Sequence, residues 1–154
     1  MITLNLQHYQ RFSWFAAGWL LAVPMAFAMQ REALQIHTQR GEIRMQVDVA
    51  RQPDELKAGL MKRDSLPADY GMLFDFGKPD KVRMWMKDTP LPLDMLFIDA
   101  QGVVIHLEQS ATPNSTRRLG TADPIRAVLE LPGGTIQRKG IKLYDTVSHA
   151  IFRP

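Results

Sequence analysis

The sequence predicts a mainly β fold, a small β-sandwich or a partly open barrel, with one short helix after the first strand. Two observations lead to this class. From residue 71 onwards, short apolar runs follow one another with turn residues between them, as the strands of sandwiches and barrels do. After residue 63, no segment with helical periodicity separates these runs, whereas a parallel α/β sheet would need crossover helices between its strands.

The first 28 residues have the pattern of a signal peptide. A long uncharged run follows Arg11 and ends in a small-x-small triplet of the kind that signal peptidase cleaves. The run also approaches the minimum length for spanning a bilayer, so an uncleaved anchor in the membrane is the alternative. Pro24 favours cleavage after Ala28, because a helix break before the cleavage site suits processing. We therefore expect a periplasmic or secreted protein whose residues 29–154 form a single β-rich domain.

Charge and cysteine content exclude several classes of function. The formal net charge is +3, and the basic residues are scattered among acids, whereas a nucleic-acid binder usually carries a basic stripe. The chain has no cysteine, so its core rather than disulfides must hold the fold. No motif predicts a cofactor. His106 and Glu108 share one face of a predicted strand, but no third ligand is indicated, so no metal site is predicted.

Local patterns define the elements of the first half. Residues 42–50, EIRMQVDVA, alternate apolar and polar side chains with period two, which predicts a half-buried strand. A short helix is predicted from Pro53 to Lys62, because proline suits a first helical position while acids occupy the first turn and bases the last. Two further strands are expected at GMLFDF (71–76) and VRMWMK (82–87), separated by a loop.

The second half continues with runs of strand length. These runs are MLFID (95–99), VVIHLEQ (103–109), AVLEL (127–131) and TVSHAIFR (146–153). Residues 100–102 predict a tight hairpin turn with a glycine in its last position. Residues 110–124 predict a polar loop, and Pro132-Gly133-Gly134 predicts a turn.

Four motifs carry a resemblance to a known family: AGLMKR (58–63), GMLFDF (71–76), WMKDTPLPLDMLFID (85–99) and VLELPGG (128–134). In this order and spacing they resemble the domain of unknown function 192 family, also called uncharacterised protein family 0127, over about residues 43–149. The resemblance implies a compact β-rich domain with one short helix, commonly exported or preceded by a hydrophobic N-terminal segment. It implies no biochemical role, because the role of the family is unassigned.

The chain departs from the family pattern at two turns. Asp88 stands where the family usually has asparagine, which replaces an amide donor by a carboxylate that only accepts hydrogen bonds. Tyr144-Asp145 stands where the family tends to have Gly-Asp. We expect a backbone position that suits glycine to be met differently there.

The candidate binding residues are Arg63, Trp85, Lys87, Asp88, Thr89, Asp94 and Glu130. A lysine held among carboxylates could bind an anionic or sugar-like ligand, and Trp85 could stack against it. Alternatively, these groups satisfy one another: Asp94 would cap a turn by accepting from backbone amides, and Arg63 would pair with Glu130 or Asp94. The residue pattern leaves both interpretations open.

We therefore predict a non-catalytic binding or accessory module for a polar small molecule or an envelope partner, because no catalytic signature is present. One alternative is a cell-envelope carbohydrate-active enzyme, with Asp94 or Glu130 as acid/base and Lys87 stabilising charge. Another is a structural envelope domain. Contact with a membrane is expected only through the N-terminal segment, if that segment is retained.

Overall fold

A computed structural model describes residues 29 and 31–153, so the predicted signal peptide lies outside the described residues. One seven-stranded sheet has the strand order β5-β4-β6-β3-β2-β1-β7. The strands are β1 (Arg31–Thr38), β2 (Gly41–Ala50), β3 (Tyr70–Asp80), β4 (Leu93–Ile98), β5 (Val104–Ala111), β6 (Ile125–Pro132) and β7 (Thr146–Ser148). The helices are α1 (Pro53–Ala58), α2 (Thr135–Lys139) and the 3-10 turn η1 (Ala150–Phe152). No helix in this described part is long and apolar enough to cross a membrane.

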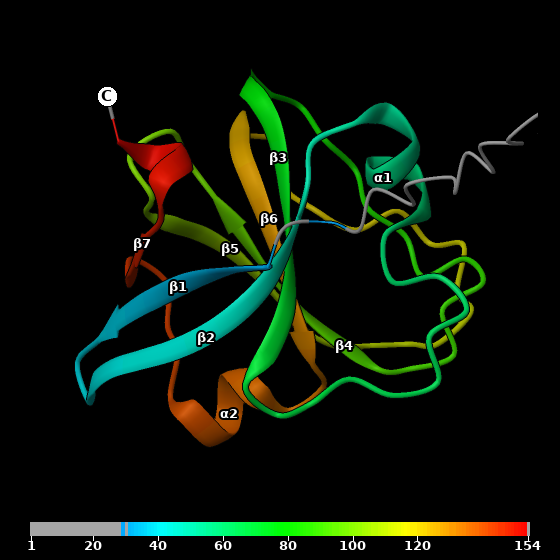
Figure 1. Cartoon of the computed structure of the whole chain (residues 1–154), viewed down its shortest axis with the longest axis horizontal. Coiled ribbons are helices and arrows are strands. Elements are labelled where there is room, and N and C mark those ends of the chain that lie inside the picture. The colour runs from blue at the N-terminus through cyan, green and yellow to red at the C-terminus, as the bar shows by residue number, and fades with distance from the viewer. Residues whose placement is uncertain (1–28, 30, 154) are drawn as a thin grey trace, which may run out of the picture.

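The sheet curls until its two edges meet (Figure 1). An antiparallel bridge joins Val103, just before β5, to Thr146 in β7. Beside this bridge the amide of Val147 donates a hydrogen bond of 2.7 Å to the carbonyl of Gly102. The predicted mainly β class is confirmed, and of the two architectures it allowed, the chain adopts the partly open barrel.

Apolar side chains pack on both faces of the curled sheet. The inner cluster includes Leu73 and Leu129, and Ile136 of α2 packs into it. A second cluster lies on the outer face of β3, β4 and β6 and includes Phe74 and Phe97. Figure 1 shows α1 and the long β3–β4 and β5–β6 connections gathered on one side of the sheet. Because both faces are covered, every residue of β4 is buried.

Most predicted elements are confirmed, with shifted boundaries. The first helix ends at Ala58 rather than Lys62, because Gly59 (φ 46°) and Lys62 (φ 60°) leave the helical conformation. The hairpin turn is confirmed, with Gly102 at φ 82°. Two elements lie where no helix or strand was predicted. They are β1, which precedes the expected first strand, and α2, which starts directly after the predicted glycine turn.

Two predicted strands are wrong in extent. VRMWMK (82–87) contributes only one bridge, from Met84 to Leu119, because the segment opposite it is the irregular β5–β6 connection. Of TVSHAIFR (146–153), only the first three residues form a strand, and η1 follows them. The ring of His149 accepts the amide hydrogen of Ile151 and so caps that turn.

The two turns that depart from the family pattern both adopt a left-handed backbone. Asp88 has φ 54° and Tyr144 has φ 71°. Asparagine and aspartate enter this region more readily than other side-chain-bearing residues, so Asp88 conserves the backbone geometry that asparagine would give. The expectation that the second turn is met differently is wrong, since Tyr144 takes the glycine-like conformation and points into solvent.

Candidate functional site

The structure brings most of the candidate residues together beneath α1 and places two elsewhere. Those together are Trp85, Lys87, Asp88, Thr89 and Glu130. Asp94 faces the interior of the barrel, and Arg63 lies in a separate open groove. The single cluster that the sequence suggested is therefore three separate environments.

Asp94, in β4, links this strand to other elements through buried hydrogen bonds. It is 0% exposed. Its Oδ1 accepts hydrogen bonds from the amides of Ser110 (2.8 Å) and Gly134 (3.0 Å), and its Oδ2 accepts from the amide of Ile136 (2.7 Å). One carboxylate thus joins β4 to β5 and to the start of α2. Asp94 accepts from backbone amides, as the structural interpretation predicted, but these belong to distant elements rather than to its own turn.

Arg63 pairs with a partner that the sequence did not suggest. Its Nη2 lies 3.0 Å from Oδ2 of Asp48 on β2, and the hydroxyl of Tyr70 donates to the other oxygen of Asp48. The predicted pairing of Arg63 with Glu130 or Asp94 is therefore wrong. Asp48 looked like an ordinary exposed position on an alternating strand, and only the fold brings Arg63 to it.

The turn that carries Lys87 is fixed by backbone hydrogen bonds. The amide of Thr89 donates to the carbonyl of Met86 (3.1 Å), and the Thr89 hydroxyl donates to the carbonyl of Lys87 (3.2 Å). The amide of Lys62 donates to the carbonyl of Asp88 (2.8 Å), which links this turn to the segment after α1. The Lys87 side chain is left exposed at the surface.

Glu130 is the buried acid of the outer face. It opposes Met95 across the β4–β6 pair, and Met95 belongs to the outer cluster. Glu130 is only 4% exposed, and no residue in the described part of the chain donates a hydrogen bond to its carboxyl or compensates its charge. Burial alone raises the pKa of Glu130 to about 8. At neutral pH most molecules therefore carry a neutral carboxylic acid here.

The carboxyl of Glu130 borders a small, partly open cavity. Its volume is about 30 Å³. Leu60 and Phe74 supply apolar walls, while Thr89 and Trp85 complete the lining together with α1 residues. A space of this size accommodates one small polar group, such as a water molecule or the tip of a ligand.

The rim of the cavity is aromatic and positively charged. Trp85 is half-buried, and the guanidinium carbon of Arg118 lies 4.4 Å from its ring centroid while Nζ of Lys87 lies 5.7 Å from it. Both distances are those of cation–π contacts. Lys57 of α1 also lines the cavity. Within the described chain, none of these three cations forms an ion pair.

Sequence reasoning missed Lys57 and Arg118. Lys57 lies on a helix that was predicted only from its proline and the charges at its two ends, and Arg118 lies in a loop predicted merely as polar. The tandem Arg117-Arg118 in that loop was the one available signal, but its approach to Trp85 depends on how the β5–β6 connection folds back over the sheet.

Asp94 and Glu130 cannot act as a pair of acids on one bond. Asp94 opposes Leu131, while Glu130 opposes Met95, so the two carboxyls point to opposite faces of the sheet. Paired carboxylates of glycosidases must both face the same bond. In addition, no three His, Asp or Glu side chains within the described ranges gather as metal ligands would.

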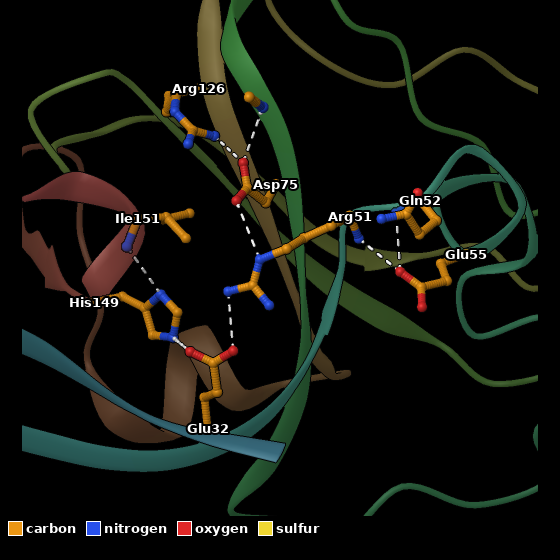
Figure 2. Close-up of polar contacts among 9 residues, drawn as sticks. Glu32, Arg51, Gln52, Glu55, Asp75, Arg126, His149 and Ile151 are labelled. Carbon is orange, nitrogen blue, oxygen red and sulfur yellow. Dashed lines mark hydrogen bonds and ion pairs between the residues drawn. The ribbon is translucent and has the colours of Figure 1, made fainter. Parts of the chain in front are cut away.

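A partly buried polar cluster, which the sequence did not reveal, surrounds Arg51 at the end of β2 (Figure 2). Arg51 reaches between two carboxylates, with Nη2 at 2.9 Å from Oε1 of Glu32 and Nε at 3.6 Å from Oδ2 of Asp75. Arg126 donates to the other oxygen of Asp75. Burial alone would raise the pKa of Asp75, but hydrogen bonds from Arg126 and Gly77 and the charge of Arg51 hold it below its usual range.

His149 completes this cluster. Its side chain is 1% exposed, and Nε2 lies 3.2 Å from Oε2 of Glu32, although the ring N–H lacks the alignment of a hydrogen bond. Burial lowers the pKa of His149, and the carboxylate of Glu32 only partly offsets that effect. Every charge in the cluster has a partner, so its arrangement is that of a structural network.

Fold and cavity together define a class of protein: a small, partly open β-barrel domain with a buried acid beneath its first helix. The chain belongs to the domain of unknown function 192 family (DUF192, Uncharacterized ACR), whose model matches residues 35–149. The predicted family is thereby confirmed.

Two solved structures are similar to this chain. One is a protein from Sinorhizobium meliloti 1021 described as a candidate transcription regulator, with 38% identity and a TM-score of 0.78, covering 80% of this chain and 97% of that one. Another is a protein of unknown function from Novosphingobium aromaticivorans DSM 12444, with 33% identity and a TM-score of 0.78, covering 83% and 91%. No curated protein matches the chain.

Proposed function

We propose that this protein is a non-catalytic binding domain for a small polar ligand, with the cavity beneath α1 as its site. The observation that carries the proposal is Glu130, a residue only 4% exposed whose carboxyl has no partner in the described chain. An unpaired buried acid destabilises a fold. Such groups are found at functional sites, where a residue needed for function is retained although it destabilises the fold.

The surroundings of Glu130 support binding rather than catalysis. Asp94, the other acid considered as a partner for it, cannot act with it, because Asp94 faces the barrel interior. Trp85 and the cations beside it give the cavity an open rim onto which a larger ligand could extend. The site therefore offers one buried polar contact and a surface, which is the composition of a small-molecule binding site.

Regulation of transcription, which the description of one similar protein suggests for that protein, has less support here. Recognition of DNA in the major groove usually needs a helix that presents several side chains to base edges. In the described part of the chain, the two α-helices have six and five residues.

Export remains part of the proposal, on the sequence pattern alone. Fractionation of cells that express the complete chain tests it, together with sequencing of the N-terminus. A periplasmic or secreted product that begins at Met29 supports cleavage after Ala28. A product found in the membrane that retains residue 1 supports an anchor instead.

The binding proposal is tested first by the stability of Glu130→Gln, which keeps the shape and removes the ionisable acid. If Glu130 is kept for a ligand, the free energy of unfolding of the variant in urea exceeds that of the wild type at pH 7. A loss as large as that caused by removing Asp94 would show that Glu130 is a structural partner, and would overturn the proposal.

A further inference from the structure

We propose that the ligand of the Glu130 cavity presents a carboxylate group. The inference rests on the proposed binding function and specifies the chemistry of its ligand. It is carried by the geometry of the cavity, whose lining includes Glu130, Lys57 and Trp85. Lys87 and Arg118 lie against the ring of Trp85, and none of the three cations forms an ion pair with a described residue.

The charge of the rim selects against cations and favours anions. Lys57, Lys87 and Arg118 are all exposed, and no ion pair engages them within the described residues. Asp88 is the acid closest along the chain to Lys87, and it too is exposed. A cationic ligand would have to pass these three positive charges to reach Glu130, whereas an anion is attracted by them.

The base of the cavity complements a carboxylate as a hydrogen-bond acceptor. Because burial favours the neutral form of Glu130, its hydroxyl can donate to an anionic oxygen. An O–H···O⁻ hydrogen bond of this kind is among the strong ones in proteins. A second negative charge close to Glu130 also favours its neutral form, so the ligand and the proton are bound together.

The size of the cavity limits what can enter. A volume of about 30 Å³ admits one small polar group and no ring. The remainder of the ligand must therefore lie at the rim against Trp85. A simple carboxylic acid and an acidic sugar share the entering group and differ in what they place on Trp85.

Trp85 makes the site directly observable. The chain has three tryptophans, and the other two, Trp14 and Trp19, precede the predicted cleavage site. In the full chain carrying Trp14→Phe and Trp19→Phe, the fluorescence of Trp85 can be followed while acetate, glucuronate or glucose is added. Acetate tests the carboxylate alone, glucuronate tests an acidic sugar, and glucose tests the neutral ring.

We expect saturable changes with glucuronate, with acetate or with both, and none with glucose. Tighter binding of glucuronate than of acetate would identify an acidic sugar, and equal binding would identify a simple carboxylate. Above about pH 8 the affinity should fall about tenfold per pH unit as Glu130 ionises. Glu130→Gln, which keeps a donor that does not titrate, should bind without this dependence on pH.

The rim is tested by a matched pair of lysines. Lys87→Met should weaken carboxylate binding about two- to fivefold, the range of an exposed ion pair. Lys139→Met removes an exposed lysine of α2 and should change nothing. Glucose that binds as well as glucuronate would overturn the carboxylate inference but not the binding function. Absence of binding by both acids would also overturn it, whereas the binding function itself stands or falls with the stability of Glu130→Gln.

Discussion

Asp94 and Glu130 are two buried acids on neighbouring strands, and their carboxyls lie in different environments. Their positions are one step apart in the register of β4 and β6, since Asp94 opposes Leu131 and Met95 opposes Glu130. Asp94 accepts three backbone hydrogen bonds inside the barrel, whereas the carboxyl of Glu130, on the outer face, has no such partner among residues 29 and 31–153. The two acids are similarly buried but have different roles. Asp94 stabilises the fold, whereas Glu130 destabilises it and borders a cavity.

The largest effect is expected at the first of these acids. Asp94→Asn replaces one accepting oxygen by a donor, which leaves at least one of the three amides facing another donor. The free energy of unfolding should fall by about 3 kcal/mol or more. Urea unfolding at pH 7 measures it, with the exposed Asp64→Asn as control. A loss below about 1 kcal/mol would mean that the amides of α2 find water instead.

The opposite sign is expected at Glu130. Its folded-state pKa is raised from 4.5 to about 8. The stability that this carboxyl contributes is therefore complete below pH 4.5 and is lost as the pH rises through about 8. Glu130→Gln should increase the free energy of unfolding at pH 7 by about 1–3 kcal/mol. The gain should shrink towards pH 4. Equal stability of the two proteins at every pH would show that Glu130 is solvated in the native state.

A smaller, pH-dependent effect is expected in the cluster around Arg51. The folded-state pKa of His149 is lowered by burial, so its contribution to stability is present above the ordinary value of about 6.5 and is lost as the pH falls below it. His149→Gln should flatten the loss of stability between pH 7 and pH 5. His37→Gln, at a histidine whose side chain is 38% exposed, is the comparison variant. If both variants flatten the curve equally, the loss does not arise from the buried cluster.

The different environments of Asp94 and Glu130 show which features of the fold and of the site can be predicted from the sequence. Alternation of apolar residues predicted the strand at 42–50, because burial of one strand face produces that pattern directly. It could not assign Asp94 and Glu130 to different faces, because that depends on the register between β4 and β6. VRMWMK shows the converse case: its alternation is real, since Met84 and Met86 are buried, but its partner segment is a loop.

Short elements escaped prediction for a related reason. β1 contains only two fully buried apolar positions, Leu34 and Ile36, which is a weak periodic signal in eight residues. α2 has five residues, and two long-range hydrogen bonds, from the amides of Gly134 and Ile136 to Asp94, anchor its start. Neither the helix nor its anchor is visible in local sequence, because the interacting residues are about 40 positions apart.

The smallest effect is expected in the groove that holds Arg63, and it tests whether groove and cavity are separate. Arg63 pairs with Asp48 while its side chain remains 37% exposed, so Arg63→Met should reduce the free energy of unfolding by at most about 1 kcal/mol. Tyr70 still donates to Asp48 in the variant, which limits the loss. Fluorescence of Trp85 should not change, because Arg63 does not line the cavity.

Arg118→Met is the matched comparison: it should alter Trp85 fluorescence and leave the free energy of unfolding within about 0.5 kcal/mol of the wild type. If Arg63→Met instead weakened carboxylate binding as strongly as Lys87→Met, the two sides of α1 would form one site, and Glu130 would no longer stand apart from the paired charges of the fold.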